Sequence, residues 1–289
     1  MHYTQKIVSN NLEMNTLGTQ LQYPHELILC LHGWLDNVGS FIPLIEEKPS
    51  LPWLCVDLVG HGHSMWRQDH QHYYFHDYIN DFINWLETQQ SETKIHLVGH
   101  SLGAAIVSLI SGLLPEKIQS CVLLDGIGPL VSNHDTIAEQ WRLALHQYRN
   151  LKPRRPYNNL ESLTKARLRK HHIKKESCEI LVKHGHVYDE TKQEYYWSFD
   201  QKLLNLSPLQ MTQEQVTSII QHIKCPVLLV NAKKGYPFEG PLYEERKKKI
   251  DNLEEVKVPG GHHVHMDNPQ LIMQHMLEFY DKHQLLKSH

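Results

Sequence analysis

The stretch Ile95-His96-Leu97-Val98-Gly99-His100-Ser101-Leu102-Gly103 decides the fold. In it a short apolar run ends in a G-x-S-x-G pattern, and a run of small and apolar residues, 102–114, follows directly. A strand, a sharp turn and a helix in this order expose a serine hydroxyl at the edge of a sheet, and the start of the helix directs its dipole towards that serine. We therefore predict that Ser101 is a nucleophile at a strand-to-helix turn.

The rest of the chain alternates between apolar runs and helical patterns. Further runs with the length of a buried strand lie at residues 27–31, 53–56, 121–124 and 226–230. Helical spacing separates several of them, and the alternation predicts an α/β protein with a mostly parallel sheet. The alternation stops after Pro129 and resumes at Cys225. We therefore expect an α/β core at residues 1–129 and 225–289, with a helical cap at residues 130–224 between its two parts.

The composition is that of a globular chain with an unusual amount of histidine. Of 289 residues, 40% are hydrophobic and 23 are histidine, and the net charge is −3 with histidine neutral. This charge, without a binding motif, argues against a nucleic-acid partner, and no apolar stretch has the length of a membrane span. The five cysteines are scattered and mostly lie in apolar runs, which predicts buried thiols in a reducing compartment and a cytoplasmic location.

The segment Gly260-Gly261-His262-His263-Val264-His265 contains the candidate base. It lies between the last predicted strand and the last helix, where the order serine, acid, histidine places the base of such a site. We predict that His262 is the general base, with His263 and His265 as alternatives. The three histidines together could also bind a metal, but they lack a zinc spacing such as H-E-x-x-H, so we expect no metal.

The candidate acid must orient the imidazole and stabilise its charged form. Its commonest position follows the strand at residues 226–230, but no carboxylate occurs there before Glu239. Asp125 ends the preceding strand, and the carboxyl end of a central strand faces the active-site crevice. We therefore predict Asp125 as the acid and keep Glu239 as the alternative.

The turn His32-Gly33-Trp34 follows the strand at residues 27–31 and contains a candidate oxyanion donor. In sheets of this kind the second donor comes from this loop, and the first is the residue after the nucleophile. We predict that the backbone N–H groups of Trp34 and Leu102 form the oxyanion hole. Because this chemistry uses main-chain groups, His32 is expected to hold the loop rather than to react.

These motifs resemble those of α/β-hydrolase fold proteins, and most closely those of the serine hydrolase-like subgroup with a helical cap. The matching segments are residues 31–37, 57–64, 99–103, 124–126 and 261–265. The resemblance covers nearly the whole chain and implies an eight-stranded, mostly parallel sheet with the cap between the sixth and seventh strands. It also supports an acid displaced to the earlier strand, as Asp125 is. Val59 stands where the family usually has proline, in a loop expected to be structural.

The predicted function is that of a serine hydrolase, a carboxylesterase that cleaves small-molecule esters through an acyl-enzyme and needs no cofactor. An acyltransferase, a thioesterase or a non-catalytic binding protein on the same fold is the alternative. Trp141 in the cap and Tyr236 are candidate substrate contacts. The basic run at residues 165–170 is expected to be a solvated helix face, with attraction of an anionic substrate as the alternative. A monomer or a homodimer is expected.

Most of the histidines are assigned no chemical task. His32, His61, His63 and His100 lie in motif loops, where hydrogen bonding or backbone geometry accounts for them. The others, His262 apart, are interpreted as residues of the polar surface. Below about pH 6 many histidines would gain a proton together, which predicts lower solubility or stability in acid.

Overall fold

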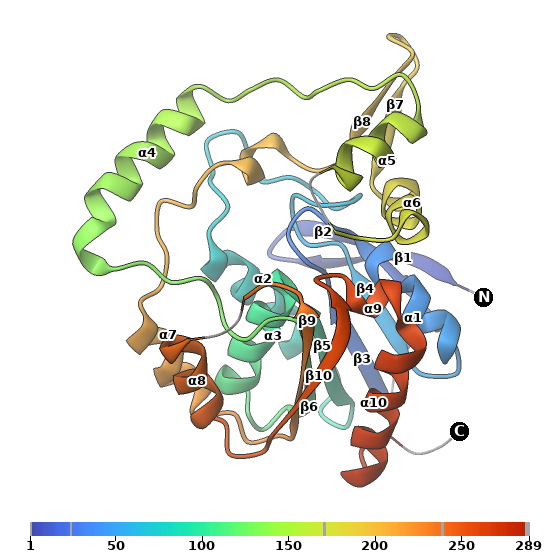
Figure 1. Cartoon of the computed structure of the whole chain (residues 1–289), viewed down its shortest axis with the longest axis vertical. Coiled ribbons are helices and arrows are strands. Elements are labelled where there is room, and N and C mark those ends of the chain that lie inside the picture. The colour runs from blue at the N-terminus through green and yellow to red at the C-terminus, as the bar shows by residue number, and fades with distance from the viewer. Residues whose placement is uncertain (1, 24, 170–171, 238–239, 287–289) are drawn as a thin grey trace.

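Eight strands form one sheet through the middle of the molecule (Figure 1). The computed structural model describes residues 2–23, 25–169, 172–237 and 240–286. The strands lie in the order β1-β2-β4-β3-β5-β6-β9-β10, and within this sheet only β2 runs against the others. The predicted α/β-hydrolase architecture of eight, mostly parallel strands is confirmed. The strands are β1 (Tyr3–Ser9), β2 (Leu12–Gly18), β3 (Glu26–Leu31), β4 (Trp53–Val56), β5 (Lys94–His100), β6 (Ile118–Leu124), β9 (Val227–Lys234) and β10 (Leu253–Gly261).

Helices flank the sheet on both faces (Figure 1). On one face α2, α3 and α7 pack together, and on the other α1 packs against α9 and α10. The helices are η1 (Val38–Phe41), α1 (Ile42–Glu47), α2 (Phe75–Glu87), α3 (Leu102–Leu113), η2 (His134–Thr136), α4 (Ile137–Arg149), α5 (Leu160–Leu168), α6 (Lys175–His184), η3 (Gln201–Leu204), α7 (Gln213–Ile220), α8 (Pro241–Lys248), α9 (Val264–Asp267) and α10 (Pro269–Lys282).

The central strand β3 shows why the apolar runs of the sequence become parallel strands. Leu27, Leu29 and Leu31 belong to the apolar cluster that includes residues of α2, α3 and α7. Ile28 and Cys30 belong to a second cluster, formed with α1 and α10. Successive side chains of a strand point to opposite faces, so a strand that is apolar at every position requires helices on both sides.

The segment between β6 and β9 lies between the sixth and seventh strands of the main sheet, where the resemblance places a cap. Helices α4, α5 and α6 lie in this segment, which the sequence predicts to be helical, and α5 and α6 share a small apolar core. The antiparallel hairpin of β7 (His186–Asp189) and β8 (Glu194–Trp197) was not predicted. Helix α7 packs against α3. The division of the chain at residues 130–224 stays a prediction.

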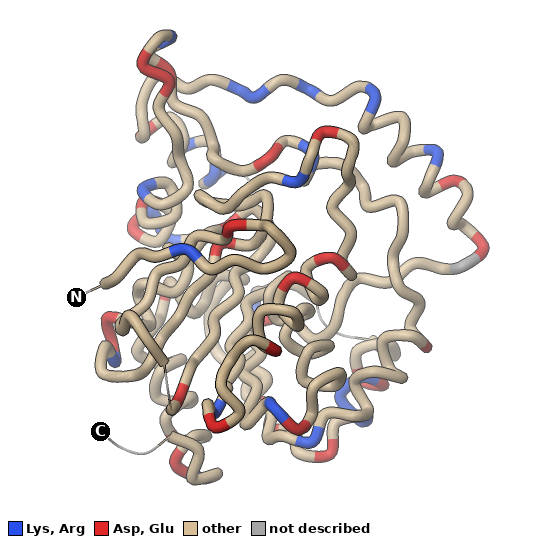
Figure 2. Tube along the Cα trace, turned by 180° about the vertical axis from the view of Figure 1, so that it is seen from behind, with Lys and Arg blue, Asp and Glu red and all other residues tan. Residues whose placement is uncertain are grey.

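Lysine and arginine are interspersed with aspartate and glutamate along the chain (Figure 2). Several of these charges pair with each other, as Lys117 does with Glu87. None of the helices in the described part of the chain has the length and apolar character needed to cross a membrane. The five cysteines are buried and not bonded to each other, as the sequence predicts.

Candidate active site

Ser101 occupies a sharp turn between β5 and α3. Its φ is 51° and its ψ is −111°, a backbone conformation that residues other than glycine rarely adopt. The turn is possible because glycines flank it. A Cβ at Gly99 would overlap the backbone of Gly103, and a Cβ at Gly103 would overlap the carbonyl oxygen of Leu31. The backbone N–H of Ser101 donates to Leu124 O at 3.1 Å, which fixes the turn against β6.

Asp125 follows β6 directly and its side chain reaches across to the end of β9. The carboxylate is 1% exposed, and its oxygens accept hydrogen bonds from the backbone N–H groups of Ala232 at 2.9 Å and Tyr236 at 3.0 Å. A Cβ at Gly235 would overlap this carboxylate, so glycine leaves the space that Asp125 fills. The alternative acid, Glu239, lies outside the described residues.

His262 is the histidine that meets Asp125. It directly follows β10, in the short loop before α9, and its Nδ1 lies 2.5 Å from Asp125 Oδ2. Its side chain is 27% exposed and lines the same cavity as Ser101. Asp125, His262 and Ser101 come from loops far apart in the sequence, and the carboxyl ends of parallel strands bring them to one edge of the sheet.

The two alternative bases are buried, and each contacts a side chain other than that of Asp125. His263 Nε2 lies 3.2 Å from Asp36 Oδ2, and burial lowers the pKa of His263 to about 4 despite that carboxylate. His265 Nε2 lies 2.8 Å from Ser40 Oγ, and burial holds the pKa of His265 well below its ordinary value. The geometry therefore favours His262 over both as the partner of the acid.

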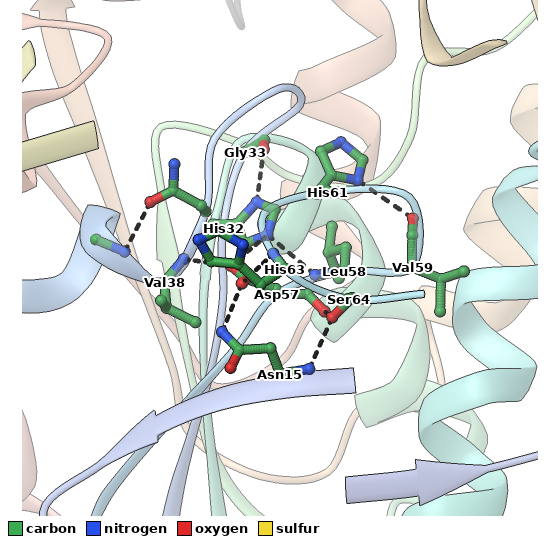
Figure 3. Close-up of polar contacts among 12 residues, drawn as sticks. Asn15, His32, Gly33, Val38, Asp57, Leu58, Val59, His61, His63 and Ser64 are labelled. Atoms are coloured by element: carbon green, nitrogen blue, oxygen red, sulfur yellow. Dashed lines mark hydrogen bonds and ion pairs between the residues drawn. The ribbon is translucent and has the colours of Figure 1, made fainter. Parts of the chain in front are cut away.

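The loops that follow β3 and β4 are held by the buried side chains of His32 and Asp57 (Figure 3). His32 Nδ1 donates to Gly33 O at 2.8 Å, and its Nε2 accepts from the backbone N–H of Leu58 at 3.0 Å. The Asp57 carboxylate accepts from the backbone N–H of Val38 at 2.7 Å. Both nitrogens of His32 are thus engaged with the backbone, as expected for a residue that supports the loop.

Trp34 and Leu102 line the same cavity as Ser101. Leu102 is the first residue of α3, so its N–H is one of the groups that have no partner within the helix. The indole Nε1 of Trp34 donates to Leu203 O at 3.1 Å, which ties the Trp34 loop to η3. The role of these two N–H groups as oxyanion donors stays a prediction.

A cavity of about 630 Å³ opens beside Ser101, and its wall is mainly apolar. Tyr236 lines it, whereas Trp141 lies on α4 with 42% of its surface exposed and is not part of the wall. The ionised carboxylate and guanidinium in the wall belong to Asp36 and Arg167, which pair with each other. The apolar side chains of the wall include Phe75, Leu102, Leu130, Leu206, Leu209 and Met211.

Asp36, His100 and His263 are the one group in the described part of the chain whose ligand atoms are close enough for a metal, within 4.8 Å of one another. The set of ligands suggested by the sequence, His262, His263 and His265, is a different one. The guanidinium of Arg167 bonds to the same Asp36 carboxylate, so a fixed positive charge already balances it. The donor set therefore fits an internal ion pair better than a metal centre.

Arg167 is the residue of this site that sequence reasoning missed. The basic run was expected to be a solvated helix face, but the Arg167 side chain is 6% exposed and points into the protein. Its position four residues after the buried Leu163 places both on the inner side of α5. That spacing could have indicated that Arg167 is buried, but the neighbouring cations of the run make this stretch of α5 look exposed throughout. Lys165 does lie on the surface, paired with Glu161.

Comparisons with known proteins agree with this architecture. A family model described as the α/β hydrolase fold matches residues 26–269. A serine hydrolase-like protein of Dictyostelium discoideum is 31% identical over 271 residues, which cover 87% of this chain and 74% of that protein. The crystal structure of a hypothetical protein from Pseudomonas aeruginosa is 30% identical, covers 96% of this chain and 99% of its own, and has a TM-score of 0.87. The thioesterase domain from the curacin biosynthetic pathway has a TM-score of 0.81 at 18% identity, covers 96% of this chain and 99% of its own, and shows a shared fold. Together these similarities support a hydrolase.

Proposed function

Because the chain belongs to the α/β hydrolase family, we propose that it is a carboxylesterase that cleaves esters of apolar acyl groups. The observation that carries the proposal is the contact between His262 Nδ1 and the buried Asp125 Oδ2 at 2.5 Å, because His262 lines the same cavity as Ser101. A histidine oriented by a buried carboxylate beside a serine on a strained turn is the arrangement that activates a hydroxyl for acyl transfer.

The proposed reaction begins with proton transfer. His262 Nε2 takes the proton of Ser101 Oγ as that oxygen bonds to the ester carbonyl carbon, and the carbonyl oxygen becomes an oxyanion held by the N–H groups of Trp34 and Leu102. The imidazolium then gives its proton to the departing alkoxide, which leaves an acyl-serine. Water, deprotonated by the same histidine, releases the carboxylic acid and restores Ser101.

Asp125 keeps His262 in the tautomer with the proton on Nδ1, so that Nε2 can accept from the serine. The two backbone N–H groups that bond to the carboxylate, from Ala232 and Tyr236, restrict its rotation. The acid is thus fixed by main-chain contacts from the end of β9, although it follows β6.

The cavity wall supports an apolar acyl group as the specificity element. Burial of apolar surface contributes about 25 cal/mol per Å², or about 0.8 kcal/mol for each CH₂ group, so a longer chain gains binding energy as long as the cavity can hold it. Arg167 is already bonded to Asp36, and Lys165 to Glu161. These pairings give little support to attraction of an anionic substrate by the basic run.

The test is active-site labelling followed by an ester series. A fluorophosphonate should label the protein, and Ser101→Ala should abolish labelling. Ser207→Ala is the matched control, because Ser207 also lines the cavity but lies on another loop, and it should be labelled like the unaltered protein. No labelling of the unaltered protein would refute the enzymatic proposal and favour a binding protein on this fold.

Hydrolysis of p-nitrophenyl esters from acetate to decanoate then measures chain preference. We expect kcat/KM to rise from acetate to medium-length chains. A maximum at acetate would contradict the apolar acyl site. Faster turnover of matched thioesters, or faster transfer to an added alcohol than to water, would reassign the reaction to a thioesterase or an acyltransferase.

A further inference from the structure

A buried group of charged and polar side chains lies behind the candidate active site. At its centre is Asp36, whose side chain is 1% exposed. One carboxylate oxygen, Oδ1, bonds to the guanidinium of Arg167. The other, Oδ2, lies 3.2 Å from His263 Nε2 and 3.5 Å from His100 Nδ1. We call these four residues the Asp36 cluster.

The Asp36 cluster contacts all the loops that the proposed reaction uses except that of the acid. Asp36 lies two residues after Trp34, in the turn closed by the bond from its own N–H to Gly33 O at 3.1 Å. His100 immediately precedes Ser101, and its Nε2 donates to the carbonyl oxygen of His262 at 2.9 Å. His263 immediately follows the base. The carboxylate therefore lies where the Trp34 loop, the Ser101 turn and the His262 loop meet, and His100 itself bonds the Ser101 turn to the His262 loop.

Through Arg167, the segment between β6 and β9 contributes a residue of α5 to this cluster. It lies on α5, and its Nη1 donates to Leu35 O at 2.9 Å, one residue after the predicted oxyanion donor. Leu35 has a φ of 61°, which costs energy for a residue with a branched side chain, so the loop needs contacts that hold it there. The guanidinium also lies over the ring of Trp197, 5.7 Å from its centre.

Stability alone does not account for this ion pair. Burying a carboxylate and a guanidinium costs desolvation energy that their attraction often only balances, and apolar side chains of the same volume would pack at least as well. What the pair supplies is geometry, because a planar guanidinium bonds to the Asp36 carboxylate and to Leu35 O in fixed directions. Burial alone would raise the pKa of Asp36, but Arg167 and His263 hold that pKa well below its usual value, so the carboxylate stays ionised.

We propose that Asp36 and Arg167 are positioning residues that hold the Trp34 loop, Ser101 and the His262 loop in one geometry and make it depend on the docking of α5. The inference rests on the proposed function, since the loops it joins are those of the proposed reaction. Removal of Arg167 leaves Asp36 buried without its cation, so the turn at Leu35 and the contacts to His100 and His263 should loosen together.

The experiment compares Arg167→Met with Lys165→Met. Both replace a cation of α5 by methionine, but Lys165 is exposed and pairs with Glu161 on the surface. With a neutral ester, Arg167→Met should lower kcat about 10- to 100-fold and leave KM within about threefold, because a misplaced reacting group slows the chemical step more than it weakens binding. Arg167→Lys, which keeps the charge but not the fixed fork, should recover part of the rate. Lys165→Met should behave like the unaltered protein.

Hydrogen exchange measured by mass spectrometry gives a readout that needs no activity. Arg167→Met should increase exchange in α5 and in residues 33–37 together, while a melting curve confirms that the variant is folded. If fluorophosphonate labelling of the unaltered protein failed, the proposed function would fall, and this exchange experiment would still decide whether the coupling exists. The inference is overturned if Arg167→Met keeps its kcat, or if increased exchange is confined to α5.

Discussion

Mild acid should destabilise this protein through histidines that are buried, rather than through the exposed ones that its composition suggests. Burial lowers the pKa of His61 to about 3, and of His96 and His263 to about 4, from an ordinary value of 6.5. Burial also lowers the pKa of His32, His100 and His265.

The sign of the effect follows from the direction of these shifts. When pH falls below 6.5, a histidine in the unfolded chain gains a proton, whereas the same histidine in the folded protein stays neutral until the pH approaches its lowered pKa. The contribution of these histidines to the free energy of unfolding is therefore fully present above about pH 7, and it decreases as the pH falls towards 4. Asp36, whose pKa is lowered from 3.8, affects stability only below this range.

The loss of stabilisation can be calculated for one histidine. A histidine with a folded pKa near 4 and an unfolded pKa near 6.5 loses about 1.4 kcal/mol of stabilisation between pH 7.5 and pH 5.5. For His61, His96 and His263 together the loss is about 4 kcal/mol, a large part of the 5–15 kcal/mol that stabilises a typical domain. The other buried histidines add to it.

His96 is the best residue for a test because it lies away from the candidate active site. It is on β5, its Nδ1 lies 2.8 Å from Ser120 Oγ, and it packs edge-on against Tyr280. Lys94 on the same strand adds a smaller repulsion that also lowers the pKa of His96. His96→Gln keeps a side chain able to bond to Ser120 but removes the titrating group.

The assay is urea unfolding followed by tryptophan fluorescence at pH 7.5 and 5.5. We expect the unaltered protein to lose about 4 kcal/mol or more between the two values, and His96→Gln to lose about 1.4 kcal/mol less. His70→Gln is the control, because the His70 side chain is exposed, and its loss should equal that of the unaltered protein. If the losses of His96→Gln and of the unaltered protein are equal, the reasoning from burial is refuted.

Three further substitutions test the site and its supports. Asp125→Asn should lower kcat for ester hydrolysis by about 10⁴-fold, because the amide favours the wrong tautomer of His262, and an unchanged kcat would remove Asp125 from the triad. Gly103→Ala should lower the urea-derived stability by about 1–3 kcal/mol, because the new methyl group meets the carbonyl oxygen of Leu31; equal stability would show that the turn can relax. Asp57→Ala should lower stability by about 1–3 kcal/mol, because the buried N–H of Val38 loses its acceptor, and an unchanged melting temperature would contradict that role.

The parts of the fold that could be predicted are those with a pattern repeated along the chain. Residues 27–31 are apolar at every position because both faces of β3 are covered, and this leaves a clear mark in the sequence. Strands β1 and β2 leave no such mark, because buried residues mix with exposed ones in β1, where Val8 is 58% exposed, and with half-buried ones in β2. The hairpin β7–β8 was missed for a similar reason, since most of its residues are only half-buried and Tyr188 is exposed.

Single side chains were harder to predict than elements. Arg167 lies in a run of cations, and only its spacing from the buried Leu163 separates it from the cations that face water. Histidine raises the same difficulty, because a neutral imidazole bonded to backbone, as in His32, is as compatible with the interior as with the surface. Burial of such residues depends on tertiary contacts that adjacent sequence does not contain.

The position of Asp125 follows from the pairing of two strands. Its backbone N–H bonds to Val230 O at 2.8 Å, as the pairing of β6 with β9 continues one residue beyond β6. From there the carboxylate reaches the N–H groups that follow β9, and Gly235 leaves the necessary space. A carboxylate after β6 therefore fills the volume that one after β9 would otherwise occupy. The absence of an acid at residues 231–237 and the presence of Asp125 are in this view one feature of the sequence, and a second carboxylate in that loop would repel the first.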